Sequence, residues 1–264
     1  MTKRNSLSAD GAFGTAPLRR PGIHVLLCMI LLSVIVLLES FTDMDMRFQN
    51  LWYDREHCQW LITRGMHEEW RWLFYGGMKK FVSAVGIAAF LCSVVGGIRK
   101  RPRLARGGVL LMLSVIILPM LIGWLKSKTN IYCPRELVDF GGVAAWQHVL
   151  GFADPANAGL VCGRCFPAGH ASGGFAGMIV FFCVSRKRRW AALFVALAVA
   201  WTMGLYQMLR GEHFLSHTMA TMAIAWMVDV LLVWGVDSCG HVLTEYAGRF
   251  RSVADRLRSA LGIR

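Results

Sequence analysis

Charged side chains are scarce in this sequence: Asp, Glu, Lys and Arg make up only 17% of its 264 residues. An ordinary soluble domain carries about 25%. Hydrophobic residues make up 55% of the chain, and the mean hydropathy is +0.46. Internal repeats and low-complexity segments are also missing from the sequence. These shortages exclude a repeat protein or a typical soluble domain and indicate a single membrane domain.

Six apolar stretches approach or reach the roughly 20 residues that a helix needs to cross a bilayer. They are Ile23–Phe41, Phe81–Ile98, Gly107–Leu125, Ala168–Val184, Trp190–Leu209 and Phe214–Val236. The fourth is the weakest, because it opens on a glycine-rich segment. We therefore predict an all-α fold, a six-transmembrane-helix bundle, with short interfacial helices formed outside by the aromatic-rich residues 42–80. The first span lacks a small-residue cleavage site, so we expect it to be retained rather than removed as a signal peptide.

Acidic residues are missing from the segments between spans two and three and between spans four and five. The first segment, RKRPRLAR, holds five basic residues, and the second, RKRR, holds four. The positive-inside rule assigns both segments, and with them both chain termini, to the cytoplasm. Charge therefore predicts topology here, and the net charge of +13 requires no nucleic-acid partner.

The predicted organisation has three parts. Residues 1–22 form a cytoplasmic N-terminal segment, residues 23–240 form the six-span membrane domain, and residues 241–264 form a basic cytoplasmic tail. Within the tail, the apolar side chains fall on one helical face and the arginines on the other. This pattern is typical of an amphipathic helix on an anionic lipid surface. A solvated C-terminal helix is an equally good interpretation.

Four of the eight cysteines fall on the predicted outer side, where disulfides are allowed. They are Cys58, Cys133, Cys162 and Cys165. The CGRC sequence that contains the last two also resembles a redox motif or half of a zinc site. We expect a structural disulfide, and four cysteines allow three different pairings.

Ionisable residues from three distant segments converge on the outer end of the predicted bundle. They are Lys126, His170, Arg210, His213 and His217. The last two histidines are four residues apart and share a helical face. The backbone N–H groups around Gly169 open a helix, which is a natural anion site. Cations beside such a site predict an anionic substrate, and phosphate fits best because it accepts several hydrogen bonds.

Two histidines beside a phosphate pocket predict phosphoryl transfer through histidine. One imidazole attacks phosphorus, and the other protonates the leaving oxygen. Cations and backbone amides can stabilise the transition state, so we expect neither a metal nor another cofactor.

Three sequence segments resemble the signature of the type 2 phosphatidic acid phosphatase superfamily. They are KSKTNIYCP (Lys126–Pro134), PAGH (Pro167–His170) and GLYQMLRGEHFLSH (Gly204–His217). Their order and spacing, and the six-span frame, are similar to a divergent bacterial membrane-associated subgroup. The resemblance implies that Lys126 and Gly169 bind phosphate, that His170 protonates the leaving group, and that His213 is the nucleophile.

Four motif positions depart from the family pattern. Cys133 and Gln207 stand where the family has Arg, Ala168 where it has Ser, and His217 where it has Asp. We predict that Arg210 and Arg135 restore positive charge, and that Ala168 still borders the phosphate. We also predict that a neutral His217 accepts a hydrogen bond from His213 and fixes its tautomer.

The leading functional hypothesis is a metal-independent lipid phosphatase in the bacterial inner membrane. Its site would face the outer leaflet, with the bilayer and a lipid phosphate as its partners and its oligomeric state open. Alternatives are a lipid-to-lipid phosphotransferase, a metalloenzyme that uses His170, His213 and His217, and a non-enzymatic carrier of anionic lipid. Chelator sensitivity would favour the metalloenzyme. Within the spans charge is almost limited to Asp229, which argues against a transmembrane ion path.

Overall fold

The computed structural model describes residue 18 and residues 20–152 and 154–260, with residues 75 and 241–260 as backbone only. The elements are α1 (Pro21–Phe41), α2 (Met44–Asn50), β1 (Tyr53–Asp54), β2 (Gln59–Trp60), α3 (Arg64–Arg71), η1 (Trp72–Gly77), α4 (Met78–Ile98), α5 (Pro102–Lys126), η2 (Pro134–Glu136), η3 (Val138–Phe140), η4 (Pro155–Asn157), α6 (Gly169–Phe175), η5 (Ala176–Ile179), α7 (Val180–Cys183), α8 (Arg189–Met208) and α9 (Leu215–Ala260). The predicted segment 1–22 lies mostly outside the described residues.

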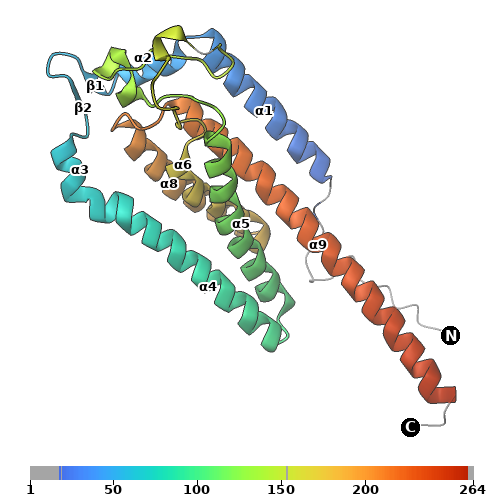
Figure 1. Cartoon of the computed structure of the whole chain (residues 1–264). Helices are drawn as coiled ribbons and strands as arrows, with labels where there is room; N and C mark the ends of the chain where they lie inside the picture. The colour runs from blue at the N-terminus through green and yellow to red at the C-terminus, as the bar shows by residue number, and fades with distance from the viewer. Residues whose placement is uncertain (1–17, 19, 153, 261–264) are drawn as a thin grey trace.

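Helices dominate the architecture, as predicted (Figure 1). Five helical segments are long and apolar enough to cross a bilayer. One is the continuous run formed by α3, η1 and α4, and the other four are α1, α5, α8 and α9. The fourth predicted span is a shorter apolar segment, Gly169–Cys183. It changes from α6 into the tighter turns of η5 before α7 ends at Cys183. Among the described residues the structure therefore gives five candidate spans and one short, broken helix where the sequence predicts six spans, the fourth of them the weakest.

The helices pack in pairs around the short segment. Helix α4 packs against α5, α1 packs against α9, and α6 contacts α5, α8 and α9 (Figure 1). Large apolar side chains of the outer helices point away from the bundle, as Leu26 (60% exposed) and Ile87 (62% exposed) illustrate. Such apolar outer surfaces fit a helix bundle surrounded by lipid.

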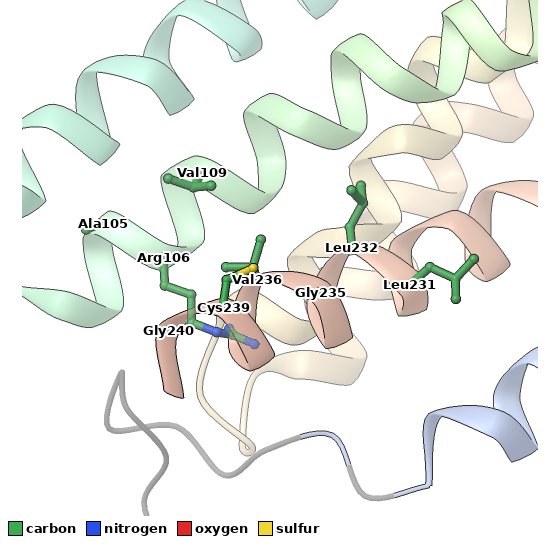
Figure 2. Close-up of a pocket in the computed structure, with 9 residues that line it drawn as sticks. All are labelled: Ala105, Arg106, Val109, Leu231, Leu232, Gly235, Val236, Cys239 and Gly240. Carbon is green, nitrogen blue, oxygen red and sulfur yellow. The ribbon is translucent and has the colours of Figure 1, made fainter. Parts of the chain in front are cut away.

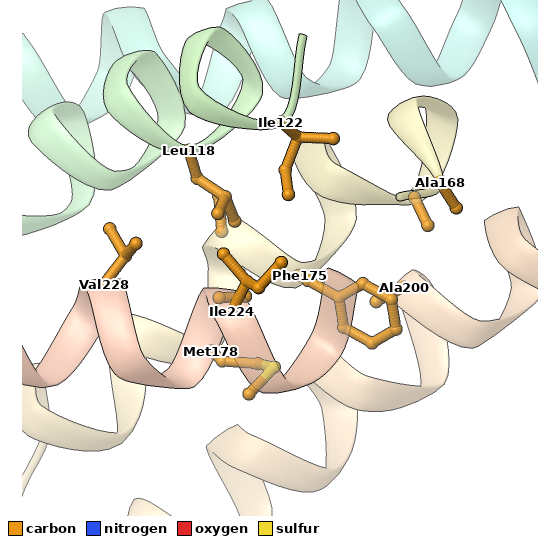
Figure 3. Packing of buried hydrophobic residues seen from close by; sticks show 11 residues of the cluster. Leu118, Ile122, Ala168, Phe175, Met178, Ala200, Ile224 and Val228 are labelled. Atoms are coloured by element: carbon orange, nitrogen blue, oxygen red, sulfur yellow. The ribbon is translucent and has the colours of Figure 1, made fainter. Parts of the chain in front are cut away.

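The main hydrophobic cluster lies where α5, α6, η5, α8 and α9 meet (Figure 3). Phe175 at the end of α6 is fully buried within it, beside Leu118, Ile224 and Ala200. Helix α6 reaches this depth because glycine lets two backbones approach. A Cβ atom added at Gly174 would lie only 2.7 Å from the Cα atom of Ala200. Small residues at a helix interface allow such close packing in membrane bundles.

Residues 42–80 form a cap over the outer end of the bundle (Figure 1). Helices α2 and α3 match the predicted short helices, whereas the antiparallel pair β1–β2 was not predicted. Helix α2 also supports the start of α9. The carboxylate of Asp45 accepts a 3.0 Å hydrogen bond from the backbone N–H of Ser216 and another from its hydroxyl. Because the first N–H groups of a helix have no partner within it, Asp45 caps α9 from a distant segment.

The predicted C-terminal tail is a direct continuation of the last span. Helix α9 runs without a break to Ala260 and extends past the ends of α4 and α5 (Figure 1). The predicted amphipathic pattern falls on side chains outside the described part of the structure. Its placement on a lipid surface remains a prediction.

Candidate active site

The loop after α5 and the loop before α6 run side by side at the outer end of the bundle. The backbone N–H of Cys165 donates a 2.8 Å hydrogen bond to the carbonyl of Ile131. The hydroxyl of Thr129 donates a 2.7 Å bond to the carbonyl of Phe166. These bonds hold the first two motif segments together, although about thirty residues separate them in the chain.

Lys126, the last residue of α5, reaches the start of α6. Its Nζ atom would lie 3.4 Å from a Cβ atom at Gly169, so glycine leaves room for the ammonium group beside the backbone. A cation at the N-terminal end of a helix creates a positive environment for an anion. The structure thus brings together the two residues predicted to bind phosphate.

His170 and His213 face each other across the site. The Nδ1 atom of His170 lies 3.5 Å from the Nε2 atom of His213. His170 is half-buried in α6, whereas His213 is only 3% exposed in the short connection between α8 and α9. One imidazole therefore sits at the surface of the site and the other at its base. This pairing brings the two predicted catalytic histidines within reach of one phosphate group.

The second ring nitrogen of His213 faces a disulfide. Cys133 and Cys165 are bonded to each other, and the Sγ atom of Cys165 lies 3.3 Å from His213 Nδ1. The pairing that the sequence left open is therefore Cys133 with Cys165, whereas Cys58 and Cys162 are exposed and free.

His217 does not make the contact that the sequence predicts. Its ring centroid lies 6.2 Å from that of His213, and its buried Nδ1 atom has no hydrogen-bond partner among the described residues. The ring packs instead edge-on against Phe166 and Phe214, each with a centroid separation of 5.3 Å. The geometric reason is that the two ring nitrogens of His213 face other groups: Nδ1 lies 3.3 Å from Cys165 Sγ, and Nε2 lies 3.5 Å from His170 Nδ1.

Ala168 is fixed against α9 rather than directed into the site. It is fully buried, its N–H donates a 3.1 Å hydrogen bond to the carbonyl of His217, and its carbonyl accepts one of 3.0 Å from the Thr221 hydroxyl. With its N–H group already bonded, Ala168 anchors the segment before α6. Of the two neighbours Ala168 and Gly169, it is Gly169 that lies beside the Lys126 ammonium group.

Arg210 and Arg135 share one carboxylate. Glu212 Oε1 lies 2.6 Å from Arg135 Nη1 and 3.1 Å from Arg210 Nη2. Arg210 also donates a 3.1 Å bond to the Oε1 atom of Gln207, which occupies one of the motif positions that depart from the family pattern. The two predicted arginines thus meet, and Glu212, to which the sequence analysis gave no role, holds them together.

Electrostatics favour an anion at this site. The positive charges of Lys126, Lys79, Arg210 and Arg135 all act on the His170 ring. Burial lowers the pKa of the His213 imidazole well below its ordinary 6.5, and the nearby His217, His170 and Lys126 act in the same direction. His213 is therefore neutral at neutral pH, which is the state that a nucleophile requires.

Lys79 was missed by the sequence analysis. It lies in the first turn of α4, and Val82, one turn further along the same face, packs on Gly173 of α6. This contact places the outer end of α4 beside the site. In the sequence, Lys79 is one of two lysines next to the start of a predicted span. Lysines commonly flank apolar helices at this position, so the pair does not by itself indicate a site.

Three atoms of types that can bind a metal ion lie close together at the His213 ring. Among the described residues, three ligand atoms that lie within 4.8 Å of one another come from Cys133, Cys165 and His213. Metals bind thiolates, and both sulfurs are engaged in the disulfide. This group also differs from the three histidines of the metalloenzyme hypothesis. In the oxidised protein these residues do not fit a metal ion.

A cavity of about 460 Å³ lies at the opposite end of the bundle (Figure 2). It is lined by the start of α5, including Arg106, and by α9 from Leu231 to Gly240. Arg106 and Lys126 are twenty residues apart on α5, which corresponds to about 30 Å along a helix. The cavity is therefore separate from the candidate active site.

Comparison with known protein families agrees with this geometry. The family model of the PAP2 superfamily matches residues 107–240, which include all three motif segments and about half of the chain. No curated protein and no solved structure matches the chain. The chain belongs to the PAP2 superfamily. Members of this superfamily are generally phosphatases and phosphoesterases, and the long apolar helices fit a membrane protein.

Proposed function

We propose that this protein is an integral membrane lipid phosphatase that hydrolyses a phosphate monoester or pyrophosphate through a phosphohistidine on His213. The observation that carries the proposal is the facing pair His213 and His170, 3.5 Å apart, next to the Lys126 ammonium group and the start of α6. A buried neutral nucleophile, a partly exposed acid and a cationic pocket are the parts that metal-free phosphoryl transfer needs.

The proposed reaction has two steps. In the first, His213 Nε2 attacks phosphorus, the bond from phosphorus to the leaving oxygen breaks, and His170 gives that oxygen a proton. In the second, water attacks the phosphohistidine, His170 accepts a proton from the water, and the bond from phosphorus to nitrogen breaks. Inorganic phosphate leaves and both histidines return to their starting states. Lys126, Arg210 and the Gly169 backbone stabilise the negative charge that develops in both steps.

Two observations support a site on the outer side of the membrane. The site lies at the end of the bundle that carries the aromatic cap, whereas the basic connections after α4 and after α7 lie at the other end (Figure 1). By the positive-inside rule this arrangement favours a site on the outer, periplasmic side of a bacterial inner membrane, with both termini inside. A disulfide beside the nucleophile also favours an oxidising compartment.

The test measures phosphate release from lipid micelles by the purified protein without added metal. Substrates are phosphatidic acid, phosphatidylglycerol phosphate, a polyprenyl diphosphate and the phosphates of lipid A. We expect turnover of at least one lipid, resistance to a chelator, and a loss of about a thousandfold or more in His213→Ala. His57→Ala is the matched control, because His57 is an exposed histidine of the cap that is paired with Asp54.

The outcomes separate the alternatives. Transfer of labelled phosphate to a second lipid without release would assign a transferase instead of a hydrolase. Chelator-sensitive turnover would assign a metalloenzyme. Binding of lipid phosphate without any turnover, unchanged in His213→Ala, would assign a carrier and overturn the enzymatic proposal.

A further inference from the structure

The Cys133–Cys165 disulfide joins two motif segments directly behind the nucleophile. Cys133 is the residue before Pro134 in the loop after α5, and Cys165 lies two residues before Pro167. Cys165 is completely buried, whereas Cys133 is partly accessible. The bond therefore fixes the distance between the loop that follows Lys126 and the segment that carries His170. It also places sulfur against His213.

The contact between Cys165 and His213 has a defined chemical consequence. A disulfide sulfur has no hydrogen, so it can only accept a hydrogen bond. At 3.3 Å from Cys165 Sγ, the Nδ1 atom of His213 makes a favourable contact when it carries the ring proton. The lone pair of the neutral ring then belongs to Nε2, which is the nitrogen that faces His170. The disulfide therefore selects the tautomer in which the nucleophilic nitrogen points into the site.

The backbone of Cys165 also provides a hydrogen-bond acceptor for the His213 ring, so both acceptors next to the ring belong to the disulfide-bonded residue. Among the described residues, His217 makes no hydrogen bond to it, and the carboxylate of Glu212 is engaged with Arg135 and Arg210. The Glu212 carbonyl lies 2.9 Å from Cys165 Sγ and not against the ring. In histidine-based sites a carboxylate commonly holds the second ring nitrogen, and here the disulfide-bonded Cys165 occupies that place.

We propose that the Cys133–Cys165 disulfide is the positioning group of the His213 nucleophile and that its reduction switches the site off. The proposal rests on the proposed phosphatase function. Once Cys165 is a thiol, its S–H can donate to His213 Nδ1, which moves the ring proton to Nε2 and removes the nucleophilic lone pair. As a thiolate it would instead favour a protonated His213, which has no lone pair either.

The redox step is a two-electron thiol–disulfide exchange with a small dithiol such as dithiothreitol. A thiolate of the reagent attacks the more accessible Cys133 sulfur and the bond to Cys165 breaks. The second reagent thiol then displaces Cys133 and closes a cyclic disulfide. The protein gains two electrons and two protons, and the reagent is oxidised. No metal or other co-reactant takes part.

The experiment compares four forms of the detergent-purified protein: wild type, wild type reduced with dithiothreitol, Cys133→Ser/Cys165→Ser, and Cys58→Ser/Cys162→Ser. We expect reduction and the first double variant to lower kcat by about 10- to 100-fold, with KM changed less than about threefold, because tautomer selection affects chemistry more than binding. The second double variant, which removes two exposed free cysteines, should retain wild-type kcat and remain sensitive to the reductant. Cys133→Ser/Cys165→Ser should be insensitive to the reductant.

A readout besides activity keeps this proposal separate from the phosphatase proposal. Long-range nitrogen–proton NMR of protein labelled in histidine reports which ring nitrogen of His213 carries the proton, with His213→Gln identifying the signal. We expect the proton on Nδ1 in the oxidised protein, and loss of that tautomer after reduction. If the oxidised protein shows this tautomer but hydrolyses nothing, only the phosphatase proposal fails.

Three results would overturn the positioning role. They are an unchanged kcat after thiol titration confirms two new thiols, an effect on KM alone, or a His213 proton on Nε2 in the oxidised protein. Stoichiometric zinc bound to free thiols in the isolated protein would also overturn it. If Cys133→Ser/Cys165→Ser fails to fold, reduced wild type with an unchanged circular dichroism spectrum carries the test.

Discussion

At the scale of single residues, the proposed chemistry depends on a neutral His213. The ring is buried at the base of the site, and the surrounding cations and histidines disfavour its protonated form. Its Nε2 atom faces His170, and its Nδ1 atom faces sulfur. In related histidine sites an adjacent carboxylate stabilises positive charge on the ring, whereas this environment opposes that charge and keeps the ring neutral. Burial is therefore the main reason why the His213 ring is neutral and keeps a lone pair for attack on phosphorus.

The first prediction concerns pH. Because the pKa of His213 is lowered, the ring stays neutral as the pH falls through 6.5 and becomes protonated only further down. We expect the acid limb of kcat/KM that belongs to His213 to lie below pH 6.5. Phosphate monoesters themselves titrate near pH 6, so the ring is also followed directly by NMR. Protonation of His213 at or above pH 6.5 would contradict the account.

The second prediction concerns Arg210. We expect Arg210→Ala to raise KM for the lipid phosphate by about tenfold, because it removes a cation that charge-assisted hydrogen bonding to phosphate would use. Lys128→Ala is the matched control, since Lys128 is exposed two residues beyond Lys126. Initial rates over a range of lipid concentrations check both. Equal KM values for the two variants would remove Arg210 from the binding site.

At the scale of elements, α4 gives the site a contribution from outside the segment that matches the family. The match begins at residue 107, whereas α4 ends at Ile98. Helix α4 leans on α6 through Val82, whose Cγ2 atom would lie 3.2 Å from a Cβ atom at Gly173. One turn toward the outer end, Lys79 adds its charge to the environment of His170. The substrate preference of this chain can therefore depend on a helix that the family motifs do not include.

The third prediction follows from this contact. Lys79→Ala should raise KM by about threefold to tenfold with little change in kcat, because a nearby cation contributes to anion binding without touching the reacting bond. Lys80→Ala, one residue later and therefore on a different helical face, should leave KM unchanged. A fall in kcat without a change in KM in Lys79→Ala would assign Lys79 a role other than substrate binding.

At the scale of the whole molecule, opposite ends of the bundle serve different purposes. One end holds the candidate site, whereas the opposite end is tied by a buried ion pair. Arg106 Nε lies 2.6 Å from Asp237 Oδ1, and the Arg106 Nη1 atom donates a 2.9 Å bond to the carbonyl of Phe182. These contacts join α5, α7 and α9. Asp229, midway between the ends, accepts a 2.6 Å hydrogen bond from the Ser114 hydroxyl.

The fourth prediction tests that separation. Asp237→Asn leaves the Arg106 charge buried without its partner, which destabilises a protein by about 3–5 kcal/mol. We expect a lower unfolding temperature in detergent but near wild-type kcat in the folded protein, because the site lies at the other end. Arg106→Met/Asp237→Leu should recover most of the lost stability. Loss of kcat at temperatures where Asp237→Asn is fully folded would contradict this division.

Much of this organisation could be predicted from the sequence. Long apolar runs predict five of the helices directly, and the order of the spans predicts that Lys126, His170 and His213 meet at one face of the membrane. The fourth span was overestimated, because hydropathy does not report the tighter turns of η5. Arg106 was counted among the loop charges that predict topology, yet it lies in α5 and is paired with Asp237.

The remaining parts of the site depend on contacts between distant segments. The partner of Cys133, the neighbour of His213 Nδ1 and the position of Lys79 are set by how the loops and α4 pack, and local patterns carry no information on them. The same reason explains the wrong prediction for His217. Spacing of four residues places it near His213 but does not determine where the His213 ring points.

The most direct test of the central claim is to trap the phosphorylated enzyme. Protein mixed with a labelled lipid phosphate is quenched in base, where phosphohistidine survives, and the label is mapped by peptide mass spectrometry. We predict phosphate on the peptide that contains His213, formed at a rate compatible with turnover and missing in His213→Ala. Turnover without any phosphoenzyme, or a label on another residue with His213 unmodified, would contradict the account.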